Sequence, residues 1–124
     1  MKTPSCSMRR EALYLEDIRN PADSIARFIR GFDEAALPES DVVSSTVIHK
    51  LAVIGEAAAR LSAELKARHP EVAWAEIVAF RNIIVHAYFG IDWSVVWLAA
   101  STEVPELREQ VAAILVTEFG DAGT

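Results

Sequence analysis

Residues 40–65 read SDVVSSTVIHKLAVIGEAAARLSAEL, and the apolar residues in this stretch recur every three or four positions. This spacing matches the 3.6-residue period of an α-helix and not the two-residue alternation of a strand. Ser40 and Asp41 suit the start of a helix, because short polar side chains cap its free backbone N–H groups. We therefore predict one long helix that ends before His69 and Pro70. Its apolar stripe consists of Val43, Val47, Leu51, Ile54, Ala58, Leu61 and Leu65.

A segment with the same period precedes it, from Leu15 to Phe32, with Gly31 as a stop signal. Pro21 lies inside this segment, where a proline removes one backbone hydrogen bond. The spacing of three and four residues between the apolar residues continues across Pro21, which favours one kinked helix over two separate helices.

Two further helices follow. One begins near Trp74 and ends near Tyr88, and the other begins after Asp92, whose carboxylate can cap it. Pro105 must kink or split this last helix. No segment has the period of a strand, so the sequence predicts an all-α fold: an antiparallel bundle of four to five helices.

Length and composition favour one soluble domain. We expect residues 1–124 to form a single domain, with disordered tails at about residues 1–8 and 120–124. Apolar residues make up 52% of the chain, but no uninterrupted apolar run reaches the roughly 18 residues of a membrane helix. The apolar excess suggests a subunit interface. Cys6 is the only cysteine, so no internal disulfide can form, and we expect a cytoplasmic protein without a membrane partner.

The formal net charge is −6, which argues against a nucleic-acid partner. The charge is unevenly distributed, however. Residues 92–124 contain six acidic residues and one basic residue, whereas residues 1–91 contain twelve acidic and eleven basic residues. A local basic groove is therefore compatible with the first 91 residues.

Residues 81–88 read RNIIVHAY and place polar groups in an apolar helix. At about 100° per residue, Asn82 and His86 lie about 40° apart on one face of the helix. Arg81 and Tyr88 lie about 20° apart on the neighbouring face. Histidine can exchange a proton near neutral pH, and arginine can bind two phosphate oxygens. This combination suits metal-free phosphoryl transfer on RNA.

A structural explanation also fits these residues. His86 can be a hydrogen-bonded structural residue, and Arg81 can pair with Glu56 or Glu76. Gly55 lies in a run of small residues that permits close approach of two helices, which would make Glu56 a supporting partner of Arg81. His49 and His69 do not have metal-ligand spacing, so we expect no metal and no cofactor.

The pattern Arg81-x4-His86-x-Tyr88, with Asn82 after the arginine, resembles the HEPN superfamily, and specifically the HepT-like toxins of MntA–HepT toxin–antitoxin pairs. Further segments add to this resemblance, which covers about residues 9–118. They are Tyr14-Leu15-Glu16-Asp17-Ile18, Ile54-Gly55-Glu56-Ala57-Ala58, Trp74-x2-Ile77, Phe89-Gly90-Ile91-Asp92, Val96-Trp97 and Val104-Pro105-Glu106-Leu107.

The resemblance implies a homodimeric helical bundle whose two motif helices form a composite endoribonuclease site. Arg81 and His86 would be catalytic, and Asn82 would assist them. Tyr88 would receive AMP from an MNT-type nucleotidyltransferase antitoxin, which would silence the toxin in a type VII-like system. Assembly of the dimer with this antitoxin into a larger hetero-oligomer is left open.

Two other functions fit the same residues. A non-catalytic helical module could dock on a nucleotidyltransferase and help it to bind nucleotide or substrate. A structural dimer could use the polar cluster only to fix its packing.

Overall fold

The computed structural model describes residues 6–86 and 90–120, with side chains described for residues 9–80 and 90–120. These residues contain helices and no strand, which confirms the all-α prediction. Residues 93–119 form one helical run with a π-helical turn inside it, so the described chain has five helices. The elements are α1 (Cys6–Phe28), η1 (Leu37–Glu39), α2 (Asp41–Arg60), α3 (Ala63–Arg68), α4 (Trp74–His86), α5 (Trp93–Leu98), η2 (Ala99–Glu103) and α6 (Val104–Phe119).

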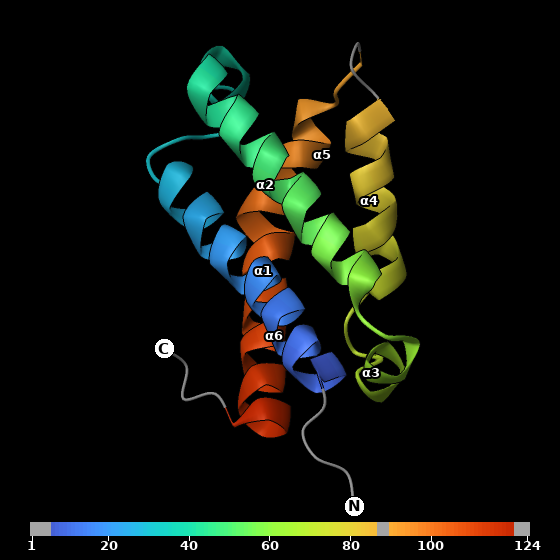
Figure 1. Ribbon diagram of the computed structural model, residues 1–124. Coiled ribbons are helices and arrows are strands. Elements are labelled where there is room, and N and C mark those ends of the chain that lie inside the picture. The colour runs from blue at the N-terminus through green and yellow to red at the C-terminus, as the bar shows by residue number, and fades with distance from the viewer. Residues whose placement is uncertain (1–5, 87–89, 121–124) are drawn as a thin grey trace, which may run out of the picture.

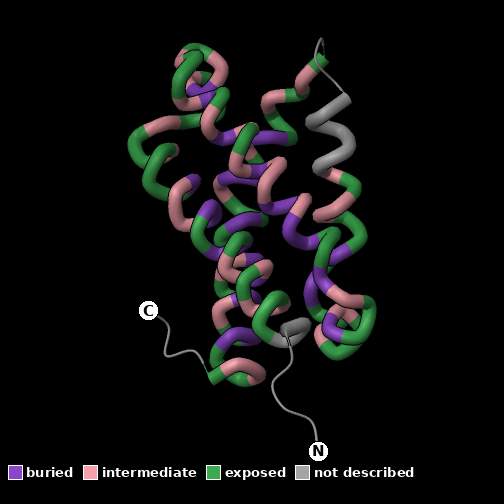
Figure 2. Tube along the Cα trace, in the orientation of Figure 1, coloured by how far each residue is buried: buried purple, intermediate pink, exposed green. Residues whose placement is uncertain are grey.

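The long helices run alternately up and down, which makes the bundle antiparallel (Figure 1). Helix α2 has the central place, because it packs against α1 and also against α4, while α6 packs against α1. The buried residues form one cluster that α1, α2 and α6 supply for the most part (Figure 2). Its largest fully buried side chains are Leu15, Ile18, Ile25, Leu37, Leu65, Ile114, Leu115, Val47 and Val111.

The start of α2 matches the prediction. The Oγ atom of Ser40 accepts a hydrogen bond from the backbone N–H of Val43 at 3.2 Å. Asp92 has the corresponding role before α5, where its carboxylate accepts from the N–H of Ser94 at 3.1 Å. A second hydrogen bond from the Ser94 hydroxyl lowers the pKa of Asp92.

The prediction of one unbroken helix to Leu65 is wrong. Helix α2 ends at Arg60, Leu61 is extended, and a separate helix α3 begins at Ala63. Ser62 causes the break, because its hydroxyl accepts from the N–H of Leu65 at 3.1 Å and so caps α3. Its own N–H donates to Glu11 of α1 at 3.1 Å. Leu61 and Leu65 are both buried, so the apolar spacing continues through the break.

The two internal prolines have different surroundings. Helix α1 passes through Pro21 as one helix, which was the favoured alternative. Pro105 lies in the first turn of α6, directly after the π-helical turn η2. Proline cannot donate a backbone hydrogen bond, and a wider turn before it lets the helix continue. Gly31 has a φ of 84°, a left-handed conformation that suits glycine beyond the end of α1.

Helix α2 is the one helix of the described residues that is long and apolar enough to cross a membrane by length and composition. It lies between α1 and α4, and the core helix of a bundle meets the same criterion.

An ionic cluster joins α3 to the end of α6. Arg68 donates two hydrogen bonds to the carboxylate of Glu118, at 3.1 and 2.7 Å. The Nε2 atom of His69 also hydrogen-bonds this carboxylate. The Arg68 hydrogen bonds hold the pKa of Glu118 below its ordinary value, and the hydrogen bond from His69 adds to this effect.

We predict that Glu118→Gln lowers the free energy of unfolding by about 1 kcal/mol at pH 7, a small value because Arg68 is half exposed. The folded-state pKa of Glu118 is depressed, so its stabilisation is complete above the ordinary value of 4.5 and disappears as the pH falls through the lowered value. Urea titrations from pH 7 to pH 2 measure this change. Glu109→Gln is the control, because Glu109 lies on the same helix and its ion pair with Arg108, at 3.4 Å with the Glu109 side chain 77% exposed, is weak. A difference between wild type and Glu118→Gln that persists unchanged at pH 2 would contradict the prediction.

Candidate functional site

Arg81, Asn82 and His86 lie in the last two turns of α4. The helical backbone confirms only that the three positions share one helix, because their side chains lie outside the described part of the structure. Tyr88, predicted as the modification site, also lies outside the described residues. The catalytic roles therefore stay predictions.

Two sets of contacts position helix α4, one at its first residue and one with α2. Its first residue, Trp74, is 7% exposed, and the indole N–H donates to the backbone carbonyl of His69 at 3.0 Å. The length of α4 packs on α2, in which Gly55 is buried. A helix of 13 residues is marginal in isolation, so these contacts determine where α4 lies.

Glu56 of α2 forms an ion pair with Arg60 one turn later, with 3.2 Å between Oε2 and Nη2. Both side chains are about half exposed. Its predicted pairing with Arg81 falls on a side chain outside the description and stays a prediction.

A polar hollow of about 300 Å³ surrounds Glu56 and was not predicted from the sequence. Tyr14 and Asp17 of α1 line one side, and His49 and Arg60 of α2 line the other. His49, Glu56 and Arg60 are seven and four residues apart, so one stripe of α2 carries all three. This spacing is the signal that could have identified the hollow. It holds one phenol, two carboxylates, one guanidinium and one imidazole.

Comparison with known proteins identifies the family of this chain. The family model described as "Ribonuclease HepT-like" matches residues 18–114, from the middle of α1 into α6. The chain belongs to the HepT-like family. The match includes all of α4, and so the positions Arg81, Asn82 and His86.

Several relatives of this HepT-like chain have names that refer to ribonucleases. One from Methanocaldococcus jannaschii, named "Putative RNase", is 31% identical over 87% of this chain and 99% of the relative. Another from Thermococcus cleftensis, named "Probable ribonuclease HepT", is 34% identical over 77% of this chain and 86% of the relative. A third from Caldanaerobacter subterraneus, also named "Putative RNase", is 31% identical over 85% of this chain and 94% of the relative. No solved structure matches this HepT-like chain.

We predict that Ile54→Ala loosens α4 in this HepT-like protein. Ile54 is 2% exposed on α2, so removing its side chain leaves a cavity and costs about 3 kcal/mol. Denaturant unfolding measures this cost, and amide hydrogen exchange should rise across α4. Val42→Ala is the control, because Val42 is 72% exposed on the same helix, and should change stability by under about 0.5 kcal/mol. Unchanged exchange in α4 would show that α2 does not hold it.

Proposed function

We propose that this protein is a metal-independent endoribonuclease and the toxin of a two-component toxin–antitoxin system. The observation that carries the proposal is the Arg81-x4-His86 spacing on α4 of a HepT-like chain whose relatives are named as ribonucleases. RNA is the substrate, and we place the protein in the cytoplasm.

The proposed reaction needs only two groups that carry protons, one as base and one as acid, and a stable positive charge. One imidazole takes the proton of the 2′-hydroxyl, whose oxygen attacks the adjacent phosphorus. The bond from phosphorus to the 5′-oxygen breaks, and an imidazolium donates a proton to this leaving oxygen. The products are a 2′,3′-cyclic phosphate and a free 5′-hydroxyl. Arg81 stabilises the charge on the phosphate oxygens in the transition state, and Asn82 orients the phosphate or His86.

A dimer supplies the two imidazoles that this reaction uses. Each chain contributes His86 from its own α4, so two motif helices facing each other would provide one base and one acid. Support comes from the angular separation of Arg81 and His86 by about 140° on one helix, which a second copy can complement.

The proposed regulator is an MNT-type nucleotidyltransferase antitoxin that transfers AMP to the Tyr88 hydroxyl. The phenol oxygen attacks the α-phosphorus of ATP, pyrophosphate leaves, and the phenol proton passes to solvent. The added group places bulk and negative charge near Arg81, where an RNA phosphate would otherwise bind. Adenylylated dimers would then be inactive.

We expect Arg81→Ala and His86→Ala each to reduce RNA cleavage at least about 100-fold. The first removes the charge that stabilises the transition state, and the second removes the group that transfers protons. Cleavage of a labelled RNA in the presence of EDTA measures the loss and shows independence from metal. Both variants should also relieve growth arrest when the toxin is expressed alone.

Arg30→Ala is the matched control, because Arg30 is exposed beyond the end of α1 and should leave cleavage unchanged. Thermal unfolding of each variant separates loss of chemistry from loss of fold. RNA left intact by the wild-type dimer, or cut equally by both motif variants, would refute the ribonuclease. Nucleotide binding by a stable complex with the transferase, without cleavage, would instead support a non-catalytic binding module.

We expect Tyr88→Phe to keep the ribonuclease activity and to escape the antitoxin. The substitution removes the hydroxyl that accepts AMP and leaves Arg81 and His86 in place. Intact-protein mass spectrometry after incubation with the antitoxin and ATP should show one AMP on the wild type and none on Tyr88→Phe. Tyr14→Phe is the control for the other tyrosine of the chain. An AMP group on Tyr88→Phe would show that the acceptor is a different residue.

A further inference from the structure

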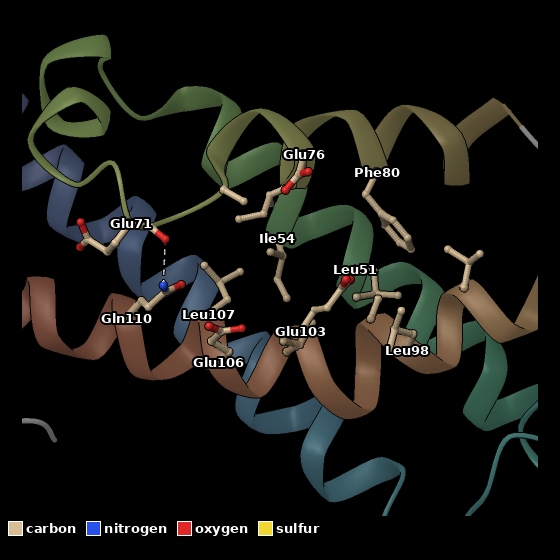
Figure 3. A pocket seen from close by; sticks show the side chains of 15 residues that line it. Leu51, Ile54, Glu71, Glu76, Phe80, Leu98, Glu103, Glu106, Leu107 and Gln110 are labelled. Atoms are coloured by element: carbon tan, nitrogen blue, oxygen red, sulfur yellow. Dashed lines mark hydrogen bonds between the residues drawn. The ribbon is translucent and has the colours of Figure 1, made fainter.

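A groove of about 440 Å³ lies between α4 and the helical run α5–η2–α6. Figure 3 shows its two walls, with α4 on one side and α5 to α6 on the other. Leu51 and Ile54 of α2 form the floor. The walls add Ile77 and Phe80 from α4, and Leu98 and Leu107 from the opposite side.

The groove leaves apolar side chains open to water. Leu98 is 51% exposed and Val95 is 42% exposed, although both lie beside the floor of the groove. Phe80 and Ile77 are half-buried. A concave site of this volume, lined mainly by apolar side chains with a few polar groups, is the usual form of a binding site.

The rim of the groove is acidic on both walls. Glu76 lies on the α4 wall, and Glu103 and Glu106 lie on the opposite wall. No lysine, arginine or histidine lines the groove among the described residues. Within that part of the chain the three glutamates also form no ion pair. Their charges are therefore available to a partner.

We propose that this groove docks a cationic amphipathic helix of another protein. The apolar floor fits the apolar face of such a helix, and the two acidic rims fit lysine or arginine residues that flank this face. The longer wall, from Val95 to Gln110, contains 16 residues, and the 15 steps between them give about 22 Å of helix. A segment of about 15 residues would fill this length.

Charge favours this occupant over a second copy of the chain. Two copies that met groove to groove would bring the glutamates of both into one interface, with no basic groove residue among the described ones to balance them. Repulsion between like charges opposes such a contact. RNA is disfavoured for the same reason, because its phosphates are also negative. Docking of such a helix would not depend on the ribonuclease activity.

Fluorescence anisotropy with the 124-residue chain tests the proposal. The probe is a labelled synthetic peptide of about 15 residues, with leucines along one helical face and lysines beside them. One control peptide has the same composition in scrambled order, and another has glutamate in place of every lysine. We expect the chain to bind only the first peptide, and more weakly as salt is raised.

Two pairs of variants locate the binding. Glu76→Gln with Glu103→Gln removes one charge from each wall, whereas Glu34→Gln with Glu109→Gln makes the same change in net charge elsewhere. Leu98→Ser removes an apolar groove residue, and Leu13→Ser removes one of matching exposure, 53%, from α1. We expect each groove variant to raise the Kd for the peptide about fivefold and each control to leave it unchanged.

Three results would overturn the proposal. Equal weakening by the groove and control variants would show that the peptide senses only net charge. Dissociation of a dimer by Leu98→Ser, seen by sedimentation without a change in peptide affinity, would assign the groove to a second copy. NMR of the wild-type chain gives a test without substitutions, and peptide-induced shifts at Leu13 but not at Ile77 and Leu98 would place the peptide on another surface.

Discussion

The apolar stripe of α2 is the interaction on which the rest of this structure depends. Val47, Leu51 and Ile54 are 5% exposed or less, and burial of each contributes about 1.5–3 kcal/mol. Helix α2 is also the element that packs against both α1 and α4. Helix α4 is too short to be stable by itself, so its position, and that of the motif it carries, depends on α2.

Helical periodicity predicted most of the fold, because burial on one face of each helix imposes a period that can be read directly. The caps at Ser40 and Asp92 were predictable for a local reason, since the hydrogen bonds that they make span two or three residues. The break at Ser62 was missed because Leu61 and Leu65 stay buried across it, so the apolar spacing carries no sign of the change. Its cause is a cap together with a contact to Glu11, 51 residues away.

The candidate site also has features that local sequence predicts and features that depend on contacts between distant residues. The Arg81-x4-His86 spacing on one helix follows from local sequence, and α4 includes both positions. The polar hollow around Glu56 could have been found from the stripe on α2, but not the contribution of Tyr14 from α1. The acidic groove had no local signal at all. Glu76 and Glu103 are 27 residues apart, and only the packing of α4 on α2, and of α2 and α6 on α1, brings them to one groove.

The acidic composition of the chain is easier to reconcile with an RNA substrate once the acidic residues are located in the structure. Two of the six acidic residues after position 91, Glu103 and Glu106, lie on the rim of the groove. The first turns of α4, with Glu76 and Phe80, form the other wall of this groove, and Arg81 is the next residue. One helix thus takes part in an acidic apolar surface and, directly after it, carries the basic motif. A cationic segment bound in the groove would contact α4 immediately before the motif, and therefore could influence its position without competing for RNA phosphates.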